Sequence, residues 1–142
     1  MTHAEPLAKL FDRVSRFIVL HFCIRRRLGY LPQRPGFAGA ARVLDVATGT
    51  ADLAIELARR LRPAEVVGVD ISEGMLERGR AKVAGAELTD IVRLARGDAA
   101  GLPYEDESFD GATVAFGVRN FEDLRAGLAG IRRVLRRGAP LV

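Results

Sequence analysis

From residue 41 onward, short apolar runs alternate with amphipathic segments, and this alternation restricts the fold more than any other feature of the chain. Each run has the length and composition of a strand that is buried on both faces of a parallel sheet. The four runs are ARVLDVA, EVVGVD, IVRLARGDA and DGATVAFG. Repeated strand–helix–strand units fold with right-handed crossovers and place helices on both faces of the sheet. The sequence therefore predicts an α/β domain with a mainly parallel sheet.

Helices are predicted between the runs, where apolar residues recur three or four positions apart. The segment TGTADLAIELARRL begins with a turn and continues as a helix, with Leu53, Leu57 and Leu61 on one face. Ser72 is expected to cap the next helix, which runs to about residue 84. A long amphipathic helix is expected over residues 120–137, and PLV at 140–142 would begin a fifth strand. We therefore expect a sheet that is incomplete at its C-terminal edge.

Residues 1–40 follow a different pattern and are predicted to form an N-terminal helical arm and a hinge. Residues 7–31 carry apolar side chains at helical spacing, and LPQRPGFAGA then breaks the pattern with prolines and glycines. The α/β domain accordingly occupies residues 41–142. The apolar stretch Phe17–Ile24 is shorter than the roughly 20 residues that span a bilayer, and it starts too far into the chain for a signal peptide. A cytoplasmic location is the expectation that follows.

The charge of the chain argues against a nucleic-acid surface. The 22 basic and 18 acidic residues give a formal net charge of +4, and few aromatic residues stand among the arginines. Cys23 is the only cysteine, so neither an intrachain disulfide nor a thiolate metal cluster is expected. His3 and His21 do not resemble a zinc site, and no metal is expected.

The segment VLDVATGTAD, residues 43–52, is the first that carries chemistry. Its small residues let a ligand approach the backbone, and a helix that opens near Asp52 offers unpaired N–H groups. Asp45 ends the predicted strand, and Gly49 and Thr50 lie in the loop, so all three are candidate ligand contacts. The same segment also suits a tight strand-to-helix turn that binds nothing.

Two further acidic residues follow predicted strands. Asp70 ends the second strand, where nucleoside-binding α/β folds place a carboxylate that accepts hydrogen bonds from both ribose hydroxyls. Its alternative role is that of a neighbour to a helix N-cap. Asp98 follows the third strand, where its carboxylate would accept a bond from an adenine amine while the amide of Ala99 donates to a ring nitrogen. We expect Asp45, Asp70 and Asp98 to share one edge of the sheet.

The loop after the first strand distinguishes between two nucleoside cofactors. Dehydrogenases cradle the pyrophosphate of a dinucleotide with G-x-G-x-x-G, whereas residues 47–54 read ATGTADLA, with one glycine. A cofactor without phosphates needs no such cradle. The loop therefore favours S-adenosylmethionine over a nicotinamide dinucleotide.

Four stretches of the chain resemble the quinone-biosynthesis C-methyltransferases, which are the demethylmenaquinone and 2-polyprenyl-benzoquinol methyltransferases. The stretches are VLDVATGTADLAIELAR, VVGVDISEGMLERGRAKV, GDAAGLPYEDESFD, and AFGVRN followed by IRRVLRRG. The resemblance runs from about residue 41 to residue 142, and AFGVRN is its most specific piece. It implies a Rossmann-like class I methyltransferase sheet, S-adenosylmethionine as the cofactor, and methyl transfer to a ring carbon of a prenylated quinol.

The resemblance also implies site residues, of which Thr50, Asp70, Asp98 and Ala99 match cofactor contacts of the family. With their neighbours at the strand ends, the expected cofactor-binding set is Asp45, Gly49, Thr50, Asp70, Ile71, Asp98 and Ala99. Ala51 replaces a glycine of the family's loop, and its methyl group is expected where the ligand passes.

The catalytic base is not identified by the sequence. His21 is the candidate by chemistry, because a base helps a hydroquinone to attack through carbon. Its alternative is a structural histidine in an apolar helix. Asp52 and Arg119 are candidates for orienting the substrate, and their alternatives are a helix cap and a surface charge.

Other functions stay open on the sequence alone. One is a cofactor-binding fragment without turnover, and another is a methyltransferase acting on a different small molecule or on RNA. With a prenylated substrate, Phe17–Ile24 and the three arginines after it are expected to contact the prenyl tail or the inner face of the membrane. The alternative for this stretch is a helix that packs in the core.

Overall fold

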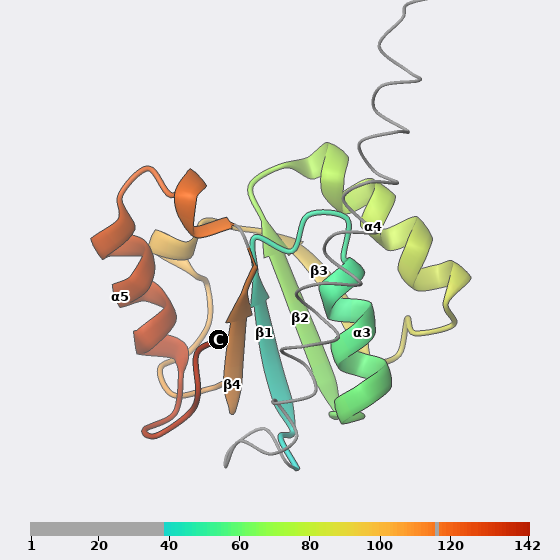
Figure 1. The fold of residues 1–142 in the computed structure, drawn as a ribbon, viewed down its shortest axis with the longest axis horizontal. Coiled ribbons are helices and arrows are strands. Elements are labelled where there is room, and N and C mark those ends of the chain that lie inside the picture. The colour runs from blue at the N-terminus through green and yellow to red at the C-terminus, as the bar shows by residue number, and fades with distance from the viewer. Residues whose placement is uncertain (1–38, 116) are drawn as a thin grey trace, which may run out of the picture.

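The computed structural model describes residues 39–115 and 117–142, which form a four-stranded sheet flanked by helices (Figure 1). The strands are β1 (Arg42–Val46), β2 (Glu65–Asp70), β3 (Val92–Arg96) and β4 (Gly111–Val114). Their order across the sheet is β3-β2-β1-β4, and all neighbours are parallel. The parallel α/β sheet predicted from the sequence is therefore confirmed. The predicted N-terminal arm, with His21, lies outside the described residues.

The two central strands are apolar on both faces, which explains why their sequences read as nearly continuous apolar runs. In β1, Val43 belongs to the core cluster on one face, while Leu44 belongs to the cluster on the other. In β2, Val66 and Val67 divide in the same way. All four are at most 3% exposed, and burying such a side chain contributes roughly 1.5–3 kcal/mol. The core thus consists of two layers, one on each side of the sheet.

Helices cover both faces of the sheet (Figure 1). α3 (Asp52–Leu61) and α4 (Glu73–Gly85) lie on one face, and α5 (Leu124–Val134) lies on the other. After β3 the chain crosses to β4, on the far side of β1, so the strand order reverses between β1 and β4. In open α/β sheets, ligands bind at the carboxyl ends of the strands beside such a reversal. None of the helices in the described residues is both long and apolar enough to cross a membrane.

Each of the four strands lies within its predicted run, and the predicted cap of α4 is confirmed. The hydroxyl of Ser72 accepts the backbone N–H of Met75 at 3.4 Å, and α4 begins at the residue after the serine. The leucines of α3 face the core, as their spacing predicted.

The last helix is shorter than the predicted 120–137. The carboxylate of Asp123 accepts the N–H of Ala126 at 3.0 Å and caps the helix there, so α5 begins only after this residue. Beyond α5, Leu141 forms a parallel bridge with Ala112 of β4. The pairing predicted for a fifth strand therefore begins at the C-terminal residues.

Gly130 lets α5 approach the short 3-10 helix η3 (Ala99–Gly101), because a Cβ atom at this position would lie 1.9 Å from the carbonyl oxygen of Ala99. We expect Gly130→Ala to push α5 away and to lower the free energy of unfolding by about 1–3 kcal/mol in urea denaturation. Gly74→Ala in α4 is the matched control, since nothing lies within 4 Å of its added Cβ. That variant should be stabilised by about 0.5–1 kcal/mol. Equal stabilities of the two variants would contradict the close approach.

Candidate functional site

Three carboxylates lie at the carboxyl edge of the sheet, as the sequence predicted. Asp45 is the penultimate residue of β1 and pairs with Gly68, two residues before Asp70 at the end of β2. Asp98 follows β3, whose last residue, Arg96, pairs with Asp70. Because the strands are parallel, these residues gather where the strand order reverses.

Asp70 is oriented by two backbone amides. The N–H of Gly49 donates to Oδ2 at 2.8 Å, and the N–H of Ser72 donates to Oδ1 at 2.9 Å. A carboxylate has about four lone-pair sites, so Asp70 keeps acceptor capacity for two ligand hydroxyls. The side chain is therefore held in place before any ligand arrives.

The loop between β1 and α3 turns through left-handed backbone conformations. Ala47, Gly49 and Ala51 have φ angles of 55°, 59° and 65°. This region costs a non-glycine residue roughly 1–2 kcal/mol, so the loop stores strain. Ala51 is fully buried, and a Cβ on Gly79 of α4 would come within 3.3 Å of its methyl group. The expectation that this methyl group meets the ligand is wrong, because it packs in the core under α4.

Asp45 lies beneath the loop and is 1% exposed. The hydroxyl of Thr48 donates to Oδ2 at 2.6 Å, and the hydroxyl of Thr113 on β4 donates to Oδ1 at 2.7 Å. The pKa of Asp45 is raised from 3.8 to about 6, chiefly because burial disfavours the charged carboxylate; the two hydroxyls oppose this rise, and the charge of Asp70 adds to it. The carboxylate of Asp45 is therefore bound by two threonine side chains, one in the loop and one on β4.

Thr50 and Asp52 are held by Lys82 of α4. The Lys82 ammonium donates to Thr50 Oγ1 at 2.7 Å and to the two Asp52 oxygens at 3.2 and 3.0 Å. The hydroxyl of Thr50 in turn donates to Asp52 Oδ2 at 3.0 Å. Asp52, a candidate for orienting the substrate, is thus engaged in fixing the start of α3.

A hollow of about 150 Å³ opens at the carboxyl edge of the sheet. Asp70, Ile71, Asp98 and Ala99 from the expected cofactor-binding set line it. The side chain of Ile71 is 63% exposed, which is uncommon for a residue type that is usually buried. The lining residues are Val46, Ala47, Asp70, Ile71, Gly97, Asp98, Ala99, Gly117, Asn120, Phe121 and Glu122.

Four of the lining residues were missed by the sequence analysis because they follow β4. Gly117 and Asn120 belong to the 3-10 helix η4, and Phe121 and Glu122 come directly after it. Within AFGVRN, Arg119 was the residue named as a candidate, and the rest of the stretch served as a family signature. The rule that ligands gather at the carboxyl ends of strands, applied to β4 as well, would have found this region.

The hollow is acidic. Asp70, Asp98 and Glu122 are its charged lining residues within the described part of the chain, which contributes no lysine or arginine to the lining. Arg119, a candidate for orienting the substrate, is exposed and is not among the lining residues. An acidic surface attracts cations and repels phosphates. The hollow therefore suits a positively charged nucleoside better than a dinucleotide.

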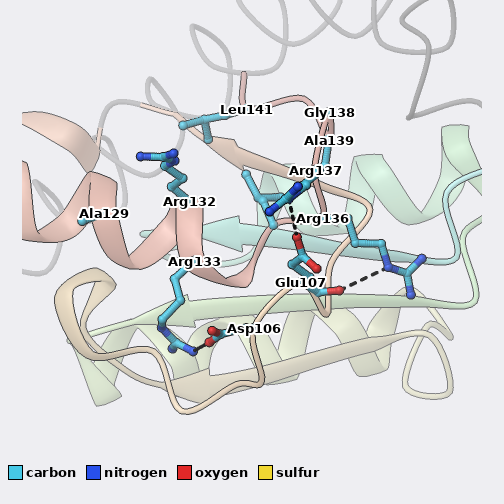
Figure 2. A pocket seen from close by; sticks show the side chains of 11 residues that line it. Asp106, Glu107, Ala129, Arg132, Arg133, Arg136, Arg137, Gly138, Ala139 and Leu141 are labelled. Atoms are coloured by element: carbon cyan, nitrogen blue, oxygen red, sulfur yellow. Dashed lines mark hydrogen bonds and ion pairs between the residues drawn. The ribbon is translucent and has the colours of Figure 1, made fainter.

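A larger groove of about 1070 Å³ lies between α5 and the C-terminal residues (Figure 2). Three of its arginines are already engaged. Arg133 pairs with Asp106 at 2.6 Å, Arg136 donates to the carbonyl oxygen of Glu107 at 3.2 Å, and Arg137 pairs with the carboxylate of Glu107 at 3.5 Å. The two acidic residues precede β4, so the groove extends toward the amino edge of the sheet. We assign the functional site to the smaller hollow, which Asp70 and Asp98 line at the carboxyl edge of the sheet.

The fold and the hollow define a class of protein. A parallel sheet that reverses beside β1, a loop without the dinucleotide fingerprint, and an acidic residue that ends β2 are typical of Rossmann-like S-adenosylmethionine-dependent methyltransferases. The SAM-dependent methyltransferase from Aquifex aeolicus has the same fold, with a TM-score of 0.73 and 23% identity. The likeness covers 96% of this chain and 69% of the Aquifex chain.

The chain belongs to the ubiE/COQ5 methyltransferase family, whose family model matches residues 8–142. A demethylmenaquinone methyltransferase of Bacteroides fragilis is 45% identical over 142 residues, which cover 97% of this chain and 56% of the relative. One from Deinococcus radiodurans is 52% identical over 101 residues, covering 71% of this chain and 41% of the relative. The chain thus spans about half the length of the curated relatives it matches. The resemblance drawn from the sequence is confirmed.

The fold alone does not determine the reaction. The [4+2]-cyclase SpnF shares it, with a TM-score of 0.73 and 26% identity over 82% of this chain and 42% of SpnF. One fold commonly supports unrelated chemistries. The family match, rather than the sheet, is therefore what points to methyl transfer.

Proposed function

We propose that this chain carries the cofactor site of a C-methyltransferase that moves a methyl group from S-adenosylmethionine to a ring carbon of a prenylated quinol. The observation that carries the proposal is the acidic hollow with an oriented Asp70 at its edge. The relatives named demethylmenaquinone methyltransferase support a quinol as the acceptor.

The adenosine part of the cofactor fits the residues after β2 and β3. Asp70 would accept hydrogen bonds from both ribose hydroxyls, and the exposed side chain of Ile71 would contact the adenine ring. Oδ1 of Asp98 accepts the N–H of Ala100 at 3.0 Å, which leaves Oδ2 for the adenine amine. The N–H of Ala99 would donate to a ring nitrogen.

The loop after β1 would hold the methionine part of the cofactor. Gly49 and Thr50 would flank it there, and the first N–H groups of α3 suit a carboxylate, whereas the N–H of Gly49 itself donates to Asp70. Asp45 supports the loop from beneath. The negative charges of the hollow stabilise a sulfonium cation in this position.

The chemistry divides between the cofactor and the protein. S-adenosylmethionine supplies a methyl group whose displacement from sulfur is favourable. The protein would orient the acceptor carbon toward that methyl group and exclude water. A base that removes the hydroxyl proton of the quinol makes its ring carbon a better nucleophile. His21 remains the candidate base and lies outside the described residues.

A methyl-transfer assay tests the proposal. The chain is incubated with methyl-labelled S-adenosylmethionine and, in parallel, with a demethylmenaquinol, a benzoquinol and transfer RNA. Any transferred label is expected on a quinol ring carbon and not on RNA. Label on RNA alone would contradict the proposal, and cofactor binding without transfer to any acceptor would favour a binding fragment.

The arginines after Phe17–Ile24 lead to a second prediction, on membrane contact. We expect the chain to sediment with vesicles that contain anionic lipid, because each arginine near such a surface contributes about 1 kcal/mol. Replacing Arg25, Arg26 and Arg27 with glutamine should therefore weaken the association about a hundredfold, by roughly 3 kcal/mol. Equal sedimentation with neutral and anionic vesicles would contradict a membrane contact of this kind.

A further inference from the structure

Thr48, in the loop between β1 and α3, is fixed at three points. Its hydroxyl donates to Asp45 Oδ2 at 2.6 Å, and its backbone N–H donates to the carbonyl of Val69 at 2.9 Å. Its carbonyl accepts the N–H of Ala51 at 3.0 Å. The first contact anchors the loop to β1, the second to β2, and the third closes the turn.

Gly68 of β2 reserves the space for this side chain. A Cβ atom at position 68 would lie 2.8 Å from Thr48 Oγ1 and 3.0 Å from Thr48 Cγ2. Gly68 is also the residue that pairs with Asp45 across the strands. The absence of a side chain at position 68 thus allows the hydroxyl of Thr48 to reach the carboxylate of Asp45.

The residue after Thr48 connects the anchored loop to Asp70. Gly49, in its left-handed conformation, directs its N–H at Asp70 Oδ2 at 2.8 Å. A change in the position of Thr48 therefore moves the amide that orients Asp70.

We infer that Asp45 is a positioning residue, which holds the loop through Thr48 so that Gly49 orients Asp70 for the ribose. The inference rests on the proposed function, in which Asp70 binds the cofactor. It assigns Asp45 an indirect role, because the carboxylate is buried and each of its oxygens accepts a threonine hydroxyl.

The charge of Asp45 matters for this role. Both hydroxyls donate to it, and a hydrogen bond to an ionised acceptor is about twice as strong as a neutral one. Protonation of Asp45 removes the negative charge that strengthens both hydrogen bonds. The protonated oxygen then donates, so one of the two threonine hydroxyls has to accept instead of donate. The groups that face Asp45 are Thr48 of the loop, Thr113 of β4 and, from β2, the charged Asp70. Cofactor affinity should therefore fall as the pH drops through about 6, where Asp45 titrates.

The test compares variants on the two sides of the same carboxylate. Thr48→Val removes the hydroxyl on the loop side, Thr48→Ser keeps it, and Thr113→Val removes the hydroxyl on the β4 side. We expect Thr48→Val to raise the Kd for S-adenosylmethionine about tenfold, because the binding-competent loop is less populated. Thr48→Ser should stay within about twofold of wild type, and so should Thr113→Val, although it loses a similar hydrogen bond.

Two further measurements separate positioning from a general loss of structure. The affinity of wild type should fall between pH 7.5 and pH 5 relative to that of Asp45→Asn, in which position 45 no longer titrates. Without cofactor, hydrogen exchange at the amide of Gly49 should speed up in Thr48→Val and not in Thr113→Val.

The outcomes distinguish this inference from the proposed function. An equal loss of affinity in Thr48→Val and Thr113→Val, or unchanged exchange at Gly49 in Thr48→Val, would overturn the positioning role. Wild-type chain that fails to bind S-adenosylmethionine would overturn the proposed function, while the exchange experiment would still decide whether Asp45 holds the loop.

Discussion

Asp70→Ala is expected to weaken the binding of S-adenosylmethionine by at least two orders of magnitude. The carboxylate is proposed to accept two charge-assisted hydrogen bonds from the ribose, each worth about 1.5–3 kcal/mol. Their joint loss, about 3–6 kcal/mol, corresponds to a factor of roughly 100 or more in Kd. The substitution also releases the amides of Gly49 and Ser72, which now donate to Asp70. Isothermal titration calorimetry measures the change.

The same substitution at the opposite edge of the sheet provides the control. Asp90 precedes β3 and is exposed, so Asp90→Ala removes a carboxylate without touching the hollow. Its affinity for the cofactor should equal that of wild type. Unchanged affinity in Asp70→Ala would remove the central support for the assignment of the ribose site.

Asp45→Asn is expected to stabilise the protein at pH 8 and to leave its stability unchanged near pH 4. Folding raises the pKa of Asp45 from 3.8 to about 6, so the folded state favours the protonated carboxyl. The stabilising contribution of this carboxyl is complete below pH 3.8 and is lost as the pH rises through 6. A shift of about two units corresponds to a cost on the order of 3 kcal/mol at neutral pH. Asparagine keeps one acceptor oxygen and carries no charge, and so avoids this cost.

Urea denaturation of wild type and Asp45→Asn at pH 4, 6 and 8 measures this difference. The gap in the free energy of unfolding should open between pH 4 and pH 6 and then level off. A gap that is constant over the whole range would show that Asp45 does not titrate with a raised pKa. Wild type keeps the charged carboxylate, which lowers its free energy of unfolding at neutral pH. The difference from Asp45→Asn therefore also measures how much stability the protein loses by holding the loop with a charged residue.

The sequence predicted the sheet because its central strands are apolar on both faces. It predicted the start of α4 because Ser72, a residue type that is favoured at helix N-caps, precedes the helical segment. The start of α5 was misplaced because the apolar pattern continues upstream of Asp123, and only the contact with Ala126 shows which residue caps the helix.

The interior of the site was harder to predict than its outline. Asp45 was expected to face a ligand because it lies near the end of a strand, yet Thr113, 68 residues away, occupies one of its oxygens. Long-range contacts of this kind leave no local signal in the sequence. The orientation of the Ala51 side chain could not be predicted from the sequence either. It depends on the left-handed backbone of the loop and on the space that Gly79 leaves in α4.

The most direct test of the account is a calorimetric titration of the wild-type chain with S-adenosylmethionine, compared with the same titration with NAD. The acidic hollow predicts saturable binding of one S-adenosylmethionine and no binding of the dinucleotide, whose phosphates it repels. Binding of NAD in preference to S-adenosylmethionine, or of neither, would contradict the account.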